Sequence, residues 1–339
     1  MGVDLGPIVV RRKIPLESLR GKTLAVDASI ELYQFLSIMR LPDGSPLKDS
    51  QGHVTSHLNG ILFRTGRLMT DHGIRFVFVF DGEPPELKLA EIAKRREAKA
   101  KARRDYEAAV AAGDTAKAWS KLVMTTSLTD EMTSDAQRLL DLMGVPWLQA
   151  PEEAEAQCAF MAARGDCWAA SSKDFDTLLF GAPRVSRFVG IAGKEFLPSQ
   201  GAFRKVEPEI IDLKATLDSV GLTREQLVDA AILIGTDFNE GIKGIGPKTA
   251  VKLLRGHGTL EALPNDTRAK LPPNTEAIRE YFLSPPTTTQ YRLQLRAVDA
   301  AGLDRFLCGE RDFSRDRVGA VIRRLRETPA GHRTLEDFG

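Results

Sequence analysis

The segment RFVFVFDG, residues 75 to 82, indicates the fold of this chain. Every position from Phe76 to Phe80 is apolar, which is typical of a strand buried on both faces of a parallel sheet. Open parallel sheets bind their ligands in a crevice beyond the carboxyl ends of the strands. Asp81 follows the last apolar residue, so the segment predicts an α/β fold with an acid at its ligand-binding edge.

Three further segments show the same short apolar run followed by acidic residues. They are KTLAVDASI (22–30), GVPWLQAPEEAEAQCAFMAARG (144–165) and DCWAASSKDFDTLLFG (166–181). Each predicts a strand that ends near an acid, with helical spacing after it. A fourth segment, TREQLVDAAILIG (223–235), has capping-box spacing between Thr223 and Gln226 and predicts a helix that delivers Asp237.

Seven acids thus stand where predicted strands or helices end, with the 153/155 pair in the first turn of a helix and the 174/176 pair in a loop. They are Asp27, Asp81, Glu153, Glu155, Asp174, Asp176 and Asp237. Oxygen donors without matching His or Cys favour Mg²⁺ or Mn²⁺ over Zn²⁺, and the natural substrate of such a site is a phosphodiester. Each acid alone is best explained as a surface residue or a helix cap, whereas their joint recurrence at strand ends favours a metal site. A structural Ca²⁺ site is the other alternative, although EF-hand spacing is missing.

Charge is distributed unevenly along the 339 residues. The whole chain carries +1, whereas KRREAKAKARR (94–104) carries +6 and leaves −5 for the remainder. A basic block beside an acidic pocket suits a protein that grips a polyanion, and a solvated helix face is the alternative. Residues 83–135 are rich in Ala, Lys, Arg and Glu and lack strand signals, which predicts long helices standing away from the sheet.

Cysteine usage and hydropathy limit the class of protein. Cys158, Cys167 and Cys308 are odd in number and widely spaced, so the sequence supports neither a disulfide framework nor a zinc site. We find no secretory signal and no uncharged run near the roughly 18 residues of a membrane helix. We therefore expect a cytoplasmic protein without a membrane partner.

The segment FNEGIKGIGPKTAVKLL (238–254) predicts two helices joined by a turn at Gly244 and Gly246, with Pro247 at the first helical position. The following helix presents N–H groups to an anion, helped by Lys248, as in helix-hairpin-helix contacts with a DNA backbone. A Walker A loop is excluded because Pro247 separates the last glycine from the lysine. A dinucleotide-binding fingerprint is excluded because this segment has no preceding strand and no third glycine. A plain turn remains the alternative.

Six blocks in order resemble the archaeal flap endonuclease 1 family of structure-specific 5′ nucleases. They are VDASIELYQFL (26–36), GHVTSHLNGILFRT (52–65), FVFDGEPPELK (78–88), APEEAEAQC (150–158), SKDFDTLLFG (172–181) and IGTDFNEGIKGIGPKTA (234–250). The resemblance covers nearly the whole chain. It implies a PIN-like nuclease core with a mainly parallel sheet, an inserted helical arch and a helix-hairpin-helix element.

The resemblance also implies a division of this single nuclease domain. We expect an N-terminal nuclease region at 1–99, the arch at 100–135, and an internal nuclease region with the hairpin at 136–262. A C-terminal helical region follows at 263–329, and a clamp-binding tail at 330–339. The protein is expected to be a monomer.

The resemblance assigns roles to individual residues. Two Mg²⁺ ions, with Mn²⁺ as a substitute, would be held by a first group around Asp27, Asp81, Glu153 and Glu155 and a second around Asp174, Asp176 and Asp237. Lys88 and Arg95 would contact the scissile phosphate. The DNA-binding set is Gly2, Tyr33, Thr55, Ser56, Arg64, Lys94, Arg96, Gly244, Gly246 and Lys248. Tyr33 would stack on the base next to the cut, with core packing as the alternative role, and K⁺ would bridge the hairpin to phosphate.

The end of the chain departs from the family. HRTLEDFG supplies His332, Leu335 and Phe338 of a sliding-clamp-binding motif, but Gly339 stands where a second aromatic residue is usual. We therefore expect weakened binding to a sliding clamp. The absence of a basic tail favours a prokaryotic cell.

The expected activity is hydrolysis of branched DNA carrying a 5′ flap, by endonuclease and 5′-3′ exonuclease action, in Okazaki fragment maturation and repair. Two metal ions roughly 3.5–4 Å apart would leave a 5′-phosphate and a 3′-hydroxyl. Two alternatives stay open. One is a sister 5′ nuclease that acts on duplex ends or bubbles, and the other is a non-catalytic DNA-junction binder.

Overall fold

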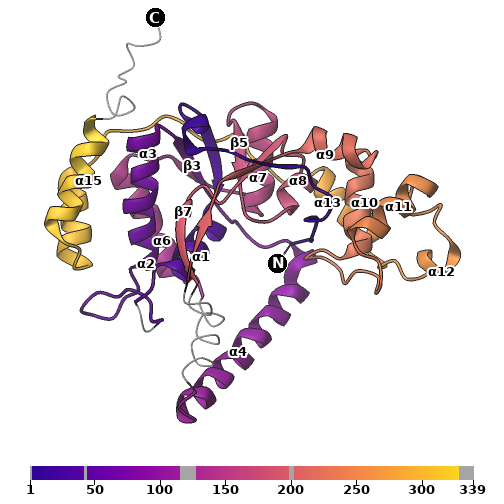
Figure 1. Cartoon of the computed structure of the whole chain (residues 1–339), viewed down its shortest axis with the longest axis horizontal. Helices are drawn as coiled ribbons and strands as arrows, with labels where there is room; N and C mark the ends of the chain where they lie inside the picture. The colour runs from indigo at the N-terminus through magenta and orange to yellow at the C-terminus, as the bar shows by residue number, and fades with distance from the viewer. Residues whose placement is uncertain (1, 42–43, 115–126, 198–201, 328–339) are drawn as a thin grey trace, which may run out of the picture.

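The structure of the chain is a computed structural model that describes residues 2–41, 44–114, 127–197 and 202–327 (Figure 1). The expected clamp-binding residues His332, Leu335 and Phe338 lie outside these ranges. No helix among the described residues is long and apolar enough to cross a membrane.

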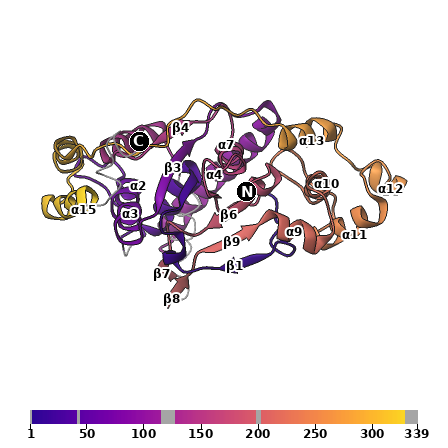
Figure 2. The same cartoon turned by 90° about the horizontal axis from the view of Figure 1, so that it is seen from above.

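A seven-stranded sheet runs through the middle of the molecule in the order β1-β9-β6-β5-β2-β3-β4 (Figure 2). Its strands are β1 (Arg11–Lys13), β2 (Thr23–Asp27), β3 (Arg75–Phe80), β4 (Trp147–Gln149), β5 (Ala169–Ser171), β6 (Arg184–Arg187) and β9 (Glu209–Asp212). β9 runs antiparallel to its two neighbours, β1 and β6, and the other strand pairs of this sheet are parallel. The predicted mainly parallel α/β fold is confirmed. A separate hairpin pairs β7 (Gly193–Leu197) with β8 (Ala202–Val206).

The central strands are apolar at every position because both faces of the sheet are covered. Along β3, Val77 and Val79 belong to one buried cluster, whereas Phe76, Phe78 and Phe80 belong to the other. Successive side chains of a strand point to opposite faces, so one continuous apolar run supplies two cores.

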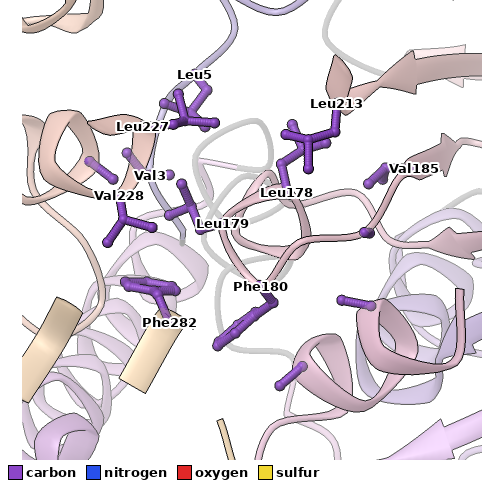
Figure 3. Packing of buried hydrophobic residues seen from close by; sticks show 14 of the residues in the cluster. Val3, Leu5, Leu178, Leu179, Phe180, Val185, Leu213, Leu227, Val228 and Phe282 are labelled. Atoms are coloured by element: carbon purple, nitrogen blue, oxygen red, sulfur yellow. The ribbon is translucent and has the colours of Figure 1, made fainter. Parts of the chain in front are cut away.

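Helices cover each face of the sheet. One face carries α7 (Ala154–Ala163), α8 (Asp176–Leu179), α9 (Leu213–Val220), α10 (Arg224–Ile234), α11 (Pro247–His257) and α13 (Thr275–Leu283). In this core the ring of Phe180 lies 5.0 Å from that of Phe282, beneath Leu227 and Val228 of α10 (Figure 3). The other face carries α1 (Ala28–Ile38), α2 (Ser56–Asn59), η2 (Gly60–Thr65), α3 (Gly66–His72), α6 (Asp130–Met143), α14 (Ala300–Leu303), η4 (Asp304–Glu310) and α15 (Arg315–Glu327).

Three further short helices are η1 (Leu16–Leu19), η3 (Glu86–Lys88) and α12 (Asn265–Arg268). The capping box predicted at the start of α10 is present, because Thr223 and Gln226 bond each other's backbone amides. However, α10 is buried almost all round rather than on one face, since it is sandwiched between α11, α13 and α8.

The helix α4 (Leu89–Ala111) leaves the body of the molecule, as Figure 1 shows. Among its described side chains only Ala102 and Ala109 are buried, which confirms the predicted helix standing away from the sheet. The next described range begins at residue 127, and in it α6 buries Ala136 and Leu139 in the core. The last residues of the expected arch, from Asp130 onward, therefore belong to a helix that lies on the sheet.

His57 of α2 is fully buried, and neither of its ring nitrogens has a hydrogen-bond partner among the residues that the structure describes. Burial, together with the charge of Arg311, lowers the pKa of this imidazole to about 3. An unfolded histidine has a pKa of about 6.5. Below that pH the unfolded chain binds a proton that the folded chain excludes, so the folded state loses stability as the pH falls.

We therefore expect His57→Leu to flatten the pH dependence of stability. Between pH 7.5 and 5.5 the unfolding free energy of the natural chain should fall about 1.4 kcal/mol more than that of the variant. Urea unfolding at both pH values measures this difference. The exposed His257, changed to Gln, is the control and should leave the natural pH dependence in place. Equal pH dependence of the natural chain and the Leu variant would contradict the assignment.

Candidate active site

Six of the seven predicted acids line one cavity of about 480 Å³ at the carboxyl ends of the parallel strands. They are Asp27, Asp81, Glu153, Glu155, Asp174 and Asp237. The seventh, Asp176, is buried beside them as the first residue of α8 rather than in the preceding loop. The cavity also contains Lys88 and Arg95, the two basic residues expected to contact the scissile phosphate.

Asp27 and Asp81 stand at the ends of neighbouring strands, and each accepts a hydrogen bond from the start of a helix. Asp27 caps α1 by accepting a hydrogen bond of 2.9 Å from the Ile30 amide. Asp81 accepts one of 2.9 Å from the amide of Ala154, the first residue of α7, and one of 2.5 Å from the Ser29 hydroxyl. The positive ends of two helices therefore point toward these carboxylates.

Hydroxyl groups and the N-terminal segment hold the other end of the acid cluster. The Ser172 and Thr177 hydroxyls donate to Glu155 over 2.9 and 3.1 Å. Asp176 accepts a hydrogen bond of 2.8 Å from the Val3 amide. Gly2 lies so close to Asp176 that a Cβ at this position would overlap the carboxylate.

Lys88 and Arg95 neutralise two of the acids. The Lys88 ammonium lies 2.6 Å from Glu153 Oε2 and 3.4 Å from Asp237 Oδ2. Arg95 Nη2 lies 2.6 Å from Asp237 Oδ1. Burial opposes the charge on Asp237, but Lys88 and Arg95 outweigh it and lower the pKa of this carboxyl.

The acids farther from Lys88 and Arg95 have strongly shifted pKa values. Burial, followed by repulsion from neighbouring carboxylates, raises the pKa of Asp27 and Glu155 well above the usual range. The same causes raise the pKa of Asp176 to about 7. These groups resist ionisation unless positive charge is brought to them.

The donor set is suited to hard divalent cations because it consists of carboxylate oxygens alone. Within the described ranges, however, no three acid, histidine or cysteine side chains surround a point closely enough to hold one ion. Lys88, Arg95 and the Ala154 amide occupy several of the carboxylate oxygens instead. The structure therefore brings the seven acids together in an arrangement neutralised by basic side chains.

The predicted turn at Gly244 and Gly246 joins α10 to α11. Gly244 has φ of 89°, a left-handed conformation that favours glycine, and Pro247 begins α11 as expected. Lys248 is exposed in the first turn of α11. The amide N–H groups at this helix start are available to an anion.

The remaining predicted DNA-binding residues differ in exposure. Arg96 is exposed on α4, and Lys94 pairs with Glu240 at 2.9 Å. Arg64 lies within electrostatic reach of Glu31, whose pKa burial raises to about 7 while Arg64 opposes the shift. Tyr33 lines the acidic cavity.

Thr55 and Ser56 are buried instead of facing solvent. The Ser56 hydroxyl donates to the Met39 carbonyl over 2.6 Å and accepts from the Leu47 amide over 2.9 Å. Through these two hydrogen bonds the Ser56 hydroxyl holds the loop before α2 in place. The sequence did not show this role, because the bonding partners lie 17 and 9 residues away.

Several residues of the cavity were not predicted from the sequence. Lys173, Gln34, Phe188 and Ile191 also line it. Phe188 has φ of 63°, which is uncommon for a bulky residue and has no signature in the sequence. The donors Ser29, Ser172 and Thr177 flank predicted acids within two residues, so proximity in sequence was the available signal.

Comparison with known proteins places this geometry in a family. The XPG N-terminal domain matches residues 4–102 and the XPG I-region matches residues 144–237. Flap endonuclease 1 of Hyperthermus butylicus is 48% identical over 100% of this chain and 98% of its own length. The chain belongs to the flap endonuclease 1 family. Flap endonuclease 1 of Archaeoglobus fulgidus is 47% identical over 99% of both chains.

Solved structures agree with this assignment. Flap endonuclease-1 from Methanococcus jannaschii matches with a TM-score of 0.76 and 37% identity, covering 97% of this chain and 99% of that one. The catalytic core of Rad2 in complex with DNA substrate matches with a TM-score of 0.68 and 26% identity, over 94% of this chain and 97% of that one. As a flap endonuclease 1 family member, the chain is a DNA-binding, structure-specific 5′ flap nuclease of DNA replication and repair.

The contact between Gly2 and Asp176 leads to a prediction for Gly2→Ala. The added Cβ should displace the buried Asp176 carboxylate and lower the cleavage rate on the order of tenfold or more, since small misplacements in an active site are costly. Single-turnover cleavage of a labelled 5′ flap measures the rate. Flap binding in EDTA should stay unchanged. Gly309→Ala, which meets no atom within 4 Å, is the matched control. Equal rates for both variants would refute this role for Gly2.

Proposed function

We propose that this flap endonuclease 1 family member cuts DNA with two Mg²⁺ ions held by its seven carboxylates. The observation that supports the proposal most strongly is the single cavity in which six of these acids meet Lys88 and Arg95. Such a concentration of acids, several of them buried, repels itself unless protons or positive charge compensate it. Mn²⁺ shares the preference for oxygen ligands and is the expected substitute.

The first ion would be held around Asp27, Asp81, Glu153 and Glu155, and the second around Asp174, Asp176 and Asp237. When bound, such a pair of ions activates the attacking water and stabilises the leaving 3′ oxygen. Burial and repulsion from neighbouring carboxylates raise the pKa of Asp27, Glu155 and Asp176, and bound cations would relieve that repulsion and keep these carboxyls ionised, which supports this assignment.

Lys88 and Arg95 would change partners during this process. Their ion pairs with Glu153 and Asp237 occupy oxygens that the ions need. Once those oxygens bind metal ions, the Lys88 and Arg95 side chains would be able to turn to the scissile phosphate. There they would stabilise the charge that grows on it during hydrolysis. The products are a 5′-phosphate and a 3′-hydroxyl.

Substrate choice would depend on DNA shape rather than on base sequence. The Gly244 and Gly246 turn, with Lys248, would hold the backbone of the downstream duplex, and K⁺ would bridge carbonyl groups of this turn to a phosphate. The free 5′ strand would pass along the basic face of α4, where Lys94 and Arg96 lie. Tyr33 would stack on the base next to the cut.

Upstream DNA would lie against the segment that contains Thr55, Ser56 and Arg64. Since the Thr55 and Ser56 side chains are buried, the neighbouring backbone would make the contact there. The tail residues His332, Leu335 and Phe338 would bind a sliding clamp weakly. A clamp that stimulates cleavage by the full chain, but not by a chain ending at residue 327, would support this part of the proposal.

Asp81→Asn tests the metal site. The amide can still accept the Ala154 hydrogen bond, so the fold should persist while a negative ligand is lost. We expect cleavage to fall at least about a hundredfold, with flap binding in EDTA changed less than twofold. Asp218→Asn is the control, because Asp218 is an exposed acid paired with Lys214 outside the cavity. Lost binding with retained cutting would refute the assignment.

A panel of labelled substrates separates this activity from its alternatives. Flap, nicked and bubble DNA are incubated with Mg²⁺, Mn²⁺ or EDTA, and DNA ligase then tests whether the cut leaves a sealable nick. Cutting mainly at flaps, only with the metals, supports the proposal. A preference for bubbles or duplex ends would indicate a sister nuclease, and no cutting of any substrate would indicate a junction binder.

A further inference from the structure

Lys99 of α4 reaches across to Tyr33 of α1. Its ammonium nitrogen lies 3.3 Å from the Tyr33 hydroxyl and 3.4 Å from the hydroxyl of Ser127. It also lies 5.4 Å from the centre of the Tyr33 ring. One side chain therefore joins α1, α4 and the point where the chain returns from the arch.

The position of the ammonium relative to the ring decides what this contact can do. Lys99 Nζ is much closer to the hydroxyl oxygen than to the ring centre, so it lies toward the hydroxyl end of Tyr33. A cation centred above the ring would compete with a stacking base. A cation at the hydroxyl end restrains the ring and leaves room for stacking.

Lys99 differs from its basic neighbours on α4. Lys94 and Arg103 pair with the carboxylates of Glu240 and Glu107, at 2.9 and 3.5 Å. In the ranges that the structure describes, no carboxylate lies within ion-pair distance of Lys99, whose hydrogen bonds go to two hydroxyls. Lys101, two residues further, is exposed and points to a different side of the helix.

Lys99 also continues the side of the helix that faces the acid cavity. Arg95, one turn earlier, reaches Asp237, and Lys99 reaches Tyr33, which lines the same cavity. A change in the position of α4 must therefore move both contacts.

We propose that Lys99 is a positioning residue that fixes the Tyr33 ring for stacking on the base next to the cut. It thereby links the arch to the surface on which that base rests. This inference depends on the stacking role given to Tyr33 in the proposed function. Lys99 acts through Tyr33 and need not touch the reacting atoms.

A double-mutant cycle tests this link. Lys99→Met should lower kcat/KM for a 5′ flap about fivefold, which is the scale of a single net hydrogen bond. Tyr33→Ala should lower it about tenfold or more. With Tyr33 already changed to Ala, the Lys99→Met change should cost less than twofold. Lys99→Arg should restore most of the loss, and Lys101→Met is the matched control for general loss of charge on α4.

Fluorescence measures the stacking directly. A flap carrying 2-aminopurine at the base next to the cut is bound in EDTA, so that no cleavage occurs. Stacking on Tyr33 quenches its emission, and we expect Lys99→Met to weaken the quenching while the Kd for the flap changes less than twofold. Lys101→Met should leave the quenching intact.

The outcomes separate this inference from the proposed function. If Tyr33→Ala lowers kcat/KM and quenching but the effect of Lys99→Met is fully additive with it, the positioning role of Lys99 is overturned and stacking stands. If Tyr33→Ala changes neither quantity, the stacking role itself fails. An equal loss with Lys101→Met would show a general charge effect and would also overturn the inference.

Discussion

Mutual repulsion among seven carboxylates at one edge of the sheet is the constraint on which the rest of this structure depends. Parallel strands bring their carboxyl ends to the same edge, so acids at the ends of β2 and β3 cannot avoid each other. Burial, and after it this repulsion, raises the pKa of Asp27 and Glu155, and the ion pairs of Lys88 and Arg95 with Glu153 and Asp237 offset part of the negative charge. A metal pair would offset the remainder.

The arch is tied to the acid cavity by this same electrostatic requirement. Lys88, Arg95 and Lys99 are seven and four residues apart, a spacing that keeps them on one side of the helical segment. The first two pair with acids and the third holds Tyr33. The base of the arch therefore takes its position from the site, and a change in the charge of the site alters the contacts of α4.

The sequence predicted the elements better than their contacts. Continuous apolar runs such as Phe76 to Phe80 identified the buried strands, and the capping pair Thr223 and Gln226 identified the start of α10, because these signals are local. The convergence of the acids followed from topology. The burial of Ser56 and the reach of Lys99 to Tyr33, 66 residues away, arise from tertiary packing, which no local pattern encodes.

One short segment connects the cavity to the turn that we propose binds duplex DNA, and so would relate the place of cutting to the shape of the DNA. Asp237 and Gly244 are seven residues apart in the connection between α10 and α11. Asn239 fixes this connection by donating to the Ile232 carbonyl over 2.8 Å, and the arch grips it through Arg95 on Asp237 and Lys94 on Glu240. A DNA backbone held at Gly244 would then lie at a restricted distance from the acids. Position along the strand can be selected by this spacing without any contact that reads a base.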